Sequence, residues 1–294
     1  DDPSVYHLFY ADDLGSPGAD LTFFEYPGSP PGRAGDGMAH TIGWRVGSAA
    51  TLDFWRARFD AEGVAHETAP DGSLAFSDRE GLRHLLTVYG GADAPLAAAA
   101  PDIPAEHALQ GFDGVRVYGS NPAAGNELLA ATLGFRQVEP GDPALNGQAA
   151  EHAAAAANWV VGGDKRTSYY VYDTPPVTPG KPGAGTVHHV AFATEVDEQD
   201  AWQQRVQQVN PHATPVIDRF WFKSIYFREP AGILFELATM GPGFTADEPL
   251  ETLGEGLSLP PNYEPLRERL EAILTPLPDT RGALTVIYLV LSAV

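Results

Sequence analysis

Short apolar runs rich in β-branched and aromatic residues recur along the chain and are typical of buried strands. Two of them lie at residues 185–192 and 232–237. Residues 197–209, between the two runs, have the spacing of apolar positions expected of a helix. The pattern therefore predicts a strand, a helix and a returning strand.

Both strands carry a polar side chain inside an apolar run. Side chains alternate between the faces of a strand, so we expect His189 to share a face with Ala191, and Glu236 to share a face with Leu234. If the two faces line one cleft, a nitrogen and an oxygen ligand meet there. The alternative is a core histidine and a salt-bridged strand carboxylate.

The same pattern repeats along the chain as a β-α-β-β-β module of about 50 residues. Residues 38–85 and 187–236 form two copies, and residues 111–172 form a third. Residues 5–26 correspond to the last two strands of a fourth copy. Its first strand and helix would lie before Asp1, so we expect a truncated, diverged or lost beginning.

Four segments follow from the repeats and their connections. We expect an N-terminal domain at 1–93 with an incomplete first module, and an Ala/Pro-rich linker at 94–106. A second domain is predicted at 107–245 and an acidic, Pro-rich tail at 246–294. The last apolar run, 283–294, is too short to span a bilayer and predicts an edge strand or a packed tail.

The charge and composition of the chain limit the classes of binding partner that we expect. The net charge is −21, from 39 acidic and 18 basic residues, and only three of the basic residues are lysines. This balance argues against nucleic acids and anionic membranes as partners. A lysine-poor acidic surface is typical of adaptation to high salt, although an ordinary acidic protein would also fit. The chain has no cysteine and opens on no signal peptide, so we expect a cytoplasmic protein without disulfides or thiolate sites.

Five stretches of sequence carry a resemblance to a known family, at residues 2–10, 15–18, 21–24, 185–192 and 215–239. They resemble the vicinal-oxygen-chelate superfamily of glyoxalases, bleomycin resistance proteins and extradiol dioxygenases, and more narrowly its hydroquinone-type ring-cleaving dioxygenases. The resemblance covers about residues 1–265. It implies an α+β fold in which tandem β-α-β-β-β modules pair into two half-open barrels.

The resemblance also implies a metal site. Of the family's three ligands, the second maps onto His189, with His188 as the less favoured neighbour, and the third maps onto Glu236. The first would lie upstream of Asp1. Glu25 occupies in the first module the place of Glu236, so it is either an extra carboxylate ligand or a solvent-facing strand residue. The implied metal is Fe(II), with Mn, Ni or Zn as alternatives.

A tyrosine completes the implied catalytic set. Tyr226 lies ten residues before Glu236, which matches the spacing of an active-site tyrosine in extradiol dioxygenases; the alternative is a tyrosine that packs in the core. The companion acid/base histidine of those enzymes would fall on Ile217, which cannot transfer a proton. Lys223 is a candidate replacement, as are Arg219 and His212.

Aromatic residues near Tyr226 are candidate walls of a substrate pocket. Strand alternation predicts that Phe220 and Phe222 point one way and Trp221 the other. The histidine of the first module, His7, alternates in face with the ligand positions, so we expect a structural role for it.

The second barrel is predicted to have lost its metal. His40 corresponds to His189, but its module has Leu85 at the carboxylate position and the partner module has Gly114 in place of a histidine.

The implied function is an extradiol-type dioxygenase that inserts O₂ into a catechol or hydroquinone at non-haem Fe(II). A glyoxalase-like metal enzyme without redox chemistry, acting as an isomerase, lyase or thiol transferase, is one alternative, and a non-catalytic small-molecule-binding protein is another. The expected partners are a small aromatic diol and O₂, and the oligomeric state stays open, a homo-oligomer included.

Overall fold

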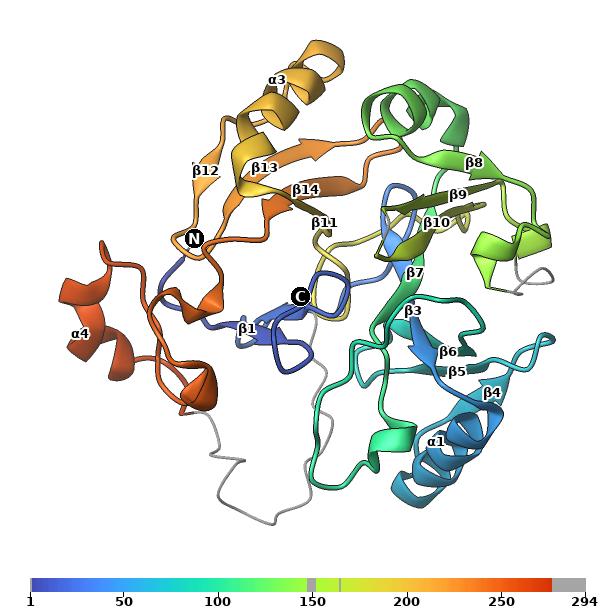
Figure 1. Ribbon diagram of the computed structural model, residues 1–294, viewed down its shortest axis with the longest axis horizontal. Helices are drawn as coiled ribbons and strands as arrows, with labels where there is room; N and C mark the ends of the chain where they lie inside the picture. The colour runs from blue at the N-terminus through green and yellow to red at the C-terminus, as the bar shows by residue number, and fades with distance from the viewer. Residues whose placement is uncertain (1, 147–151, 164, 277–294) are drawn as a thin grey trace.

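A computed structural model describes residues 2–146, 152–163 and 165–276. Within these residues the strands form three sheets, of two, eight and four strands. Figure 1 shows helices on the outer sides of the two larger sheets, with α3 at the top and α1 at the lower right.

The eight-stranded sheet takes its strands from two modules. Its central pair joins one module to the next, and that pair is antiparallel. In spatial order the strands are β4 (His66–Thr68), β5 (Leu74–Ser77), β6 (Arg83–Val88), β3 (Ala39–Val46), β7 (Phe112–Tyr118), β10 (Thr167–Asp173), β9 (Ala157–Gly162) and β8 (Arg136–Val138).

The four-stranded sheet belongs to the last module, and the two-stranded sheet comes from the start of the chain. In spatial order the larger one consists of β11 (Val190–Thr194), β14 (Leu234–Thr239), β13 (Lys223–Arg228) and β12 (Ile217–Asp218). The smaller one pairs β1 (His7–Tyr10) with β2 (Leu21–Phe24). β1 lies on the side of the four-stranded sheet that faces away from α3 (Figure 1).

Helices connect the first and second strands of the modules. The described helices and helical turns are α1 (Ala49–Glu62), η1 (Ala105–His107), η2 (Pro122–Gly125), η3 (Glu127–Thr132), η4 (Pro143–Leu145), η5 (Val196–Glu198), α3 (Gln199–Val209), η6 (Phe244–Ala246), η7 (Leu250–Thr252), η8 (Glu264–Leu266) and α4 (Arg267–Glu271). None of the helices within the described ranges is long and apolar enough to cross a membrane.

The predicted β-α-β-β-β module is confirmed. The element order β3-α1-β4-β5-β6 recurs as β11-α3-β12-β13-β14, and in both the first strand pairs parallel with the last. α1 begins where the Ser48 hydroxyl accepts a hydrogen bond from the Thr51 N–H, and it ends at Gly63, whose φ of 69° suits a left-handed cap. The α+β fold of tandem modules, which the resemblance implied, is therefore confirmed.

The 94–106 linker does not separate two sheets. β3 lies before it and β7 after it, yet the two strands pair directly, with Ile42 opposite Val115 and Gly43 opposite Gly114. A sheet therefore continues across the boundary that the sequence predicted. The reason is that the linker is long enough to return the chain to the edge of β3.

Packing at this joint depends on two glycines. A Cβ on Gly43 would overlap the Tyr169 hydroxyl, and a Cβ on Gly114 would overlap the ring and carbonyl oxygen of Tyr169. The side chain of Tyr169 is 2% exposed. Glycine at both positions lets the backbone approach a large buried ring closely.

The largest core cluster joins the third module to the last. Tyr170 and Tyr172 of β10 pack with Phe227 and Phe235 of the four-stranded sheet, and Val206 of α3 lies in the same cluster. These side chains occupy the face of the sheet that α3 covers. The opposite face of β13 and β14 is therefore left for other groups.

The described part of the tail contains a short helix. α4 and the turn before it lie between residues 263 and 274, and Leu270 and Leu274 are buried. The apolar run 283–294 lies outside the described residues.

Gly114→Ala is expected to destabilise the protein by about 1–3 kcal/mol, because the added methyl overlaps Tyr169 and the strands must move apart. Urea unfolding at constant salt would measure the change. Gly141→Ala is the control, since a Cβ there meets nothing within 4 Å. Equal unfolding midpoints for the two variants would contradict this account of the joint.

Asp20 predicts a pH dependence of stability. Burial, with the nearby charge of Asp12, raises the pKa of Asp20 to about 7 from 3.8. The unfolded chain therefore releases this proton more easily, so the free energy of unfolding falls as the pH rises from about 4 to 7.

Asp20→Asn should remove that loss. We expect it to stabilise the protein on the order of 2 kcal/mol at pH 8 and hardly at all at pH 4. Urea unfolding at the two pH values tests this against Asp53→Asn, where the side chain is 77% exposed. A gain that is the same at both pH values would show that Asp20 is not the titrating group.

Candidate active site

Glu236 lies in the middle of β14 on the face turned away from α3. Its neighbours Phe235 and Leu237 point into the core, so alternation sends Glu236 to the opposite face. Ala191 of β11 lies opposite Glu236 on one side and Tyr226 of β13 on the other. The carboxylate is nevertheless 4% exposed, so it needs partners.

Three side chains supply those partners. His189 Nε2 lies 2.8 Å from Glu236 Oε2. The Tyr226 hydroxyl donates to Glu236 Oε1 at 2.7 Å, and the Ser224 hydroxyl donates to the same oxygen. The structure thus brings His189, Glu236 and Tyr226 together, as the sequence predicted for one cleft. Ser224 was not predicted from the sequence. Its position two residues before Tyr226, and so on the same face of the strand, could have indicated it.

These contacts set the ionisation of Glu236 and Tyr226. Burial by itself raises the pKa of Glu236, but the hydrogen bonds of its three partners and the charge of His189 outweigh it and leave the pKa below its usual value. Burial and the charge of Glu236 raise the pKa of Tyr226 to about 12. At neutral pH the site therefore holds a carboxylate and a protonated phenol.

His188 lies next to the ion pair of His189 and Glu236, and its ring contacts that of His189. The two Nδ1 atoms are 2.9 Å apart, and the ring of Phe24 meets His188 edge-on at 5.7 Å. Burial and the charges of His189 and Arg228 lower the pKa of His188. In such a contact one Nδ1 donates and the other accepts. The tautomer of one histidine ring therefore determines the tautomer of the other.

His7 joins the same group of rings from β1. It lies opposite Phe24 in the β1–β2 pair and stacks on that ring at 4.2 Å, and the ring of Phe9, two residues further along β1, lies 4.3 Å away at a tilt. Burial, followed by the charge of His189, lowers the pKa of His7 to about 4. The sequence predicted a structural histidine facing away from the ligands, whereas the structure places it on the face that carries Phe24.

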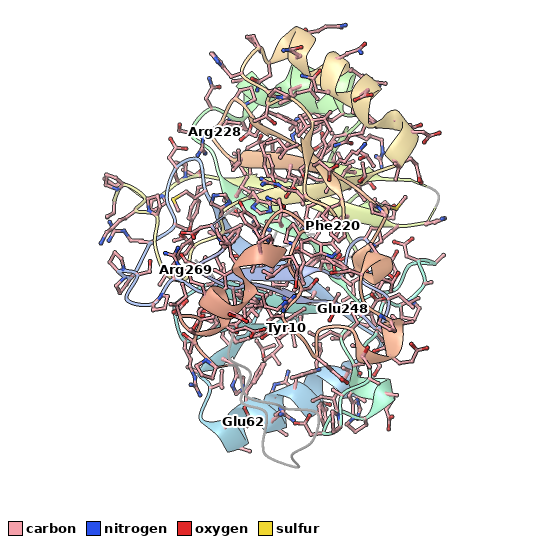
Figure 2. The ribbon with its side chains drawn as sticks, turned by 90° about the vertical axis from the view of Figure 1, so that its left-hand side faces the viewer. Tyr10, Glu62, Phe220, Arg228, Glu248 and Arg269 are labelled. Carbon is pink, nitrogen blue, oxygen red and sulfur yellow. The ribbon has the colours of Figure 1, made fainter. Side chains whose placement is uncertain are left out.

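Trp221 and Phe220 do not follow the predicted alternation. β13 begins only at Lys223, and Phe220 has a φ of 76°, so residues 220–222 are not an extended strand. Trp221 turns to the tail and its Nε1 donates to Asp247 Oδ1 at 2.8 Å. Phe220 and Glu248, both labelled in Figure 2, line a surface pocket at the tail.

Phe222 does lie near the rings of β1. It meets Phe9 at 6.4 Å and Phe244 at 6.4 Å, both edge-on, and Phe9 lies 4.9 Å from Phe244. Of the three predicted aromatic walls, Phe222 therefore approaches the His7 side of the cluster.

Lys223 and Glu25 both lie on faces away from the carboxylate. Lys223 alternates with Ser224 along β13 and is exposed. The Glu25 N–H continues the β1–β2 ladder by donating to the Tyr6 carbonyl, so its side chain points opposite to that of Phe24. The residue of the first module whose side chain faces the site is Phe24. The sequence comparison that matched Glu25 with Glu236 was therefore shifted by one residue.

The second barrel differs from the prediction by one register step. Gly43 pairs with Leu85 as Ala191 pairs with Glu236, so Thr41, not His40, stands where His189 stands. His40 Nε2 instead contacts Asp173 Oδ2 at 2.9 Å.

As a metal site the cluster offers two ligands. An imidazole nitrogen and a carboxylate oxygen that lie 2.8 Å apart form a donor set that suits Fe(II), Mn, Ni and Zn. The residues that the structure describes contain no group of three His, Asp or Glu side chains placed to hold a metal ion. His189 and Glu236 therefore fit as two ligands of a larger set.

Known proteins resemble this chain over most of its length. Residues 111–237 match the model of the Glyoxalase/Bleomycin resistance protein/Dioxygenase superfamily. The chain is 35% identical over 285 residues to "Putative ring-cleaving dioxygenase MhqA" of Bacillus subtilis, covering 94% of this chain and 88% of that protein.

Two further proteins extend the likeness. "Chlorohydroquinone/hydroquinone 1,2-dioxygenase" of Sphingobium indicum is 26% identical over 279 residues, which covers 90% of this chain and 82% of the relative. The crystal structure of a "putative dioxygenase" from Bacillus subtilis superposes with a TM-score of 0.83 at 31% identity, covering 94% of this chain and 86% of the other.

Proposed function

The chain belongs to the glyoxalase/bleomycin resistance protein/dioxygenase superfamily, and we propose that it is a ring-cleaving dioxygenase that opens an aromatic diol with O₂. The observation that carries the proposal is the buried carboxylate of Glu236, which receives an imidazole from one neighbouring strand and a phenol from the other. A nitrogen ligand, an oxygen ligand and a proton donor thus converge on one face of one sheet. The names of the relatives support the same reaction.

Fe(II) is the metal we propose, with Mn, Ni or Zn as alternatives, and members of this superfamily bind divalent metals. His189 Nε2 and Glu236 Oε2 would hold it. When bound, Fe(II) at a His and carboxylate site with open positions brings O₂ and a substrate oxygen together. Ser224 would hold the other oxygen of Glu236 and so fix the direction of the carboxylate.

Tyr226 donates its one hydroxyl proton to Glu236 when no substrate is present, and we propose that it turns this proton to the substrate when the diol binds. Its phenol keeps its proton well above neutral pH, since its pKa lies near 12. A positioned donor of this kind stabilises negative charge on a substrate oxygen as the ring is attacked. The guanidinium of Arg219, 5.3 Å from the centre of the Tyr226 ring, adds positive charge on the same side.

The proposed substrate is a catechol or a hydroquinone. Aromatic rings surround the polar pair, with Phe24 beside His188 and Tyr226 perpendicular to His189 at 6.1 Å. Such a lining suits a flat, uncharged ring with hydroxyl groups. The surplus of acidic residues fits work in the cytoplasm of a cell with high internal salt, which we propose as the setting.

A second candidate is a protein that binds the diol without cleaving it. The observation that favours it is the presence of only two metal ligands among the described residues. O₂ consumption separates the two candidates, because binding alone consumes none.

Glu236→Gln should abolish iron retention and lower O₂ uptake at least about 100-fold, because an amide is a poorer ligand than a carboxylate and cannot keep its charge. The assay is iron content and O₂ uptake with hydroquinone and catechol, after anaerobic Fe(II) loading in high salt. Glu67→Gln, at an exposed ion pair with Arg83, is the control.

The outcomes distinguish the candidates. Uptake of one O₂ per diol, lost in Glu236→Gln and kept in Glu67→Gln, supports the dioxygenase. Diol binding without O₂ uptake in the unmutated protein favours the binding protein, and iron retention by Glu236→Gln equal to that of the unmutated protein would remove Glu236 from the ligand set.

Tyr226→Phe should lower kcat by about 10²–10³ while iron content stays unchanged, because the phenyl ring fills the same space without the proton. Steady-state O₂ uptake and iron analysis measure the two effects. Tyr10→Phe is the matched control, since Tyr10, labelled in Figure 2, is 53% exposed and lies next to Phe9 in sequence, on the other face of β1. An unchanged kcat in Tyr226→Phe would refute the proposed role.

A further inference from the structure

His7 is connected to the candidate site by an unbroken series of ring contacts. It stacks on Phe24 at 4.2 Å, Phe24 meets His188 at 5.7 Å, and His188 meets His189 at 5.2 Å. These contacts bridge the two-stranded sheet and the four-stranded sheet. β1 therefore places His7 on the side of the four-stranded sheet that carries His189 and Glu236.

The polar end of His7 has nothing to bind within the described residues. Its Nε2 is buried and has no hydrogen-bond partner there. A buried polar atom without a partner costs about 1–3 kcal/mol, so its persistence at a site calls for a ligand that satisfies it. Stacking on Phe24 and the tilted contact with Phe9 hold the imidazole in place, and neither contact uses that nitrogen.

Two observations limit the distance between His7 and the pair of His189 and Glu236. The charges of His189, Glu236, Arg219 and His188 all act on His7, so it lies within electrostatic reach of the site. It is nonetheless not part of any three-residue group that could hold a metal, among the residues described. A ligand that contacts both His7 and the His189 and Glu236 pair must therefore be a molecule larger than a single ion.

The repeat gives His7 a counterpart. In the last module, Tyr226 lies opposite Glu236 in an antiparallel pair whose side chains face the site. In the first module, His7 lies opposite Phe24 in the equivalent pair. His7 therefore stands where Tyr226 stands, on the other side of the site.

We infer that His7 is a substrate-binding residue, whose Nε2 forms a hydrogen bond with the hydroxyl of the diol that does not reach the His189 and Glu236 pair. The inference rests on the proposed function and makes it narrower. It assigns the second hydroxyl a partner, which Ile217, an apolar side chain opposite Ser224, cannot provide. It also favours a hydroquinone, whose two hydroxyls lie at opposite ends of the ring.

The test compares hydroquinone with phenol, which lacks the second hydroxyl. Calorimetric titration under argon, with Fe(II)-loaded protein, gives both dissociation constants without turnover. We expect the unmutated protein to bind hydroquinone at least about tenfold more tightly than phenol. His7→Phe should bind the two ligands equally and keep the affinity for phenol.

Two further variants serve as controls for this experiment. His7→Gln keeps a polar group near the same place and should recover part of the preference, and it replaces His7→Phe if thermal melting shows that the latter does not fold. His107→Phe changes a histidine that stacks on Phe54 at 4.5 Å, beside α1, and should keep the full preference.

Two results would overturn the inference, and they differ. If folded His7→Phe or His7→Gln prefers hydroquinone over phenol as strongly as the unmutated protein does, His7 does not bind the second hydroxyl, while the proposed function stands. If the unmutated protein binds neither hydroquinone nor catechol, the proposed function fails and the inference fails with it.

Discussion

The burial of one carboxylate constrains the rest of the site. Glu236 is 4% exposed, and an unpaired charge at that depth would cost several kcal/mol. Its donors come from both neighbouring strands, with His189 just before β11 and Ser224 and Tyr226 on β13. A slip of either strand by one residue would turn its donor to the core face and leave Glu236 unpaired. The groups proposed for chemistry therefore also fix the register of the sheet.

The sequence could predict the part of the site that lies within one module. His189 lies just before β11 and Glu236 lies on β14, and the two strands pair parallel within one module, so strand alternation determines how these two side chains meet. Tyr226 was expected only from the resemblance to extradiol dioxygenases. The β-α-β-β-β order followed from the same periodicity. These features depend on local pattern and on rules of strand connection, and both can be read from one chain.

Features that depend on contacts between modules could not be predicted. His7 faces the site because β1 packs beside the last module, and no periodicity states which sheets face each other. Glu25 and His40 were each misplaced by one position, which reverses the face on a strand. Phe220 was placed on a strand, but its φ of 76° is a property of the backbone that the sequence of aromatic residues does not indicate.

The two halves of the molecule show how packing decides where the same module can carry chemistry. In the last module the position opposite Glu236 is Ala191, and the face stays open to His189 and Tyr226. In the second module the equivalent position is Gly43, and Tyr169 fills the space above it. A ring that needs glycine on two strands leaves no room for a side chain at Gly43 or Gly114. Leu85 at the carboxylate position is then the expected consequence, because a charge there would be buried without partners.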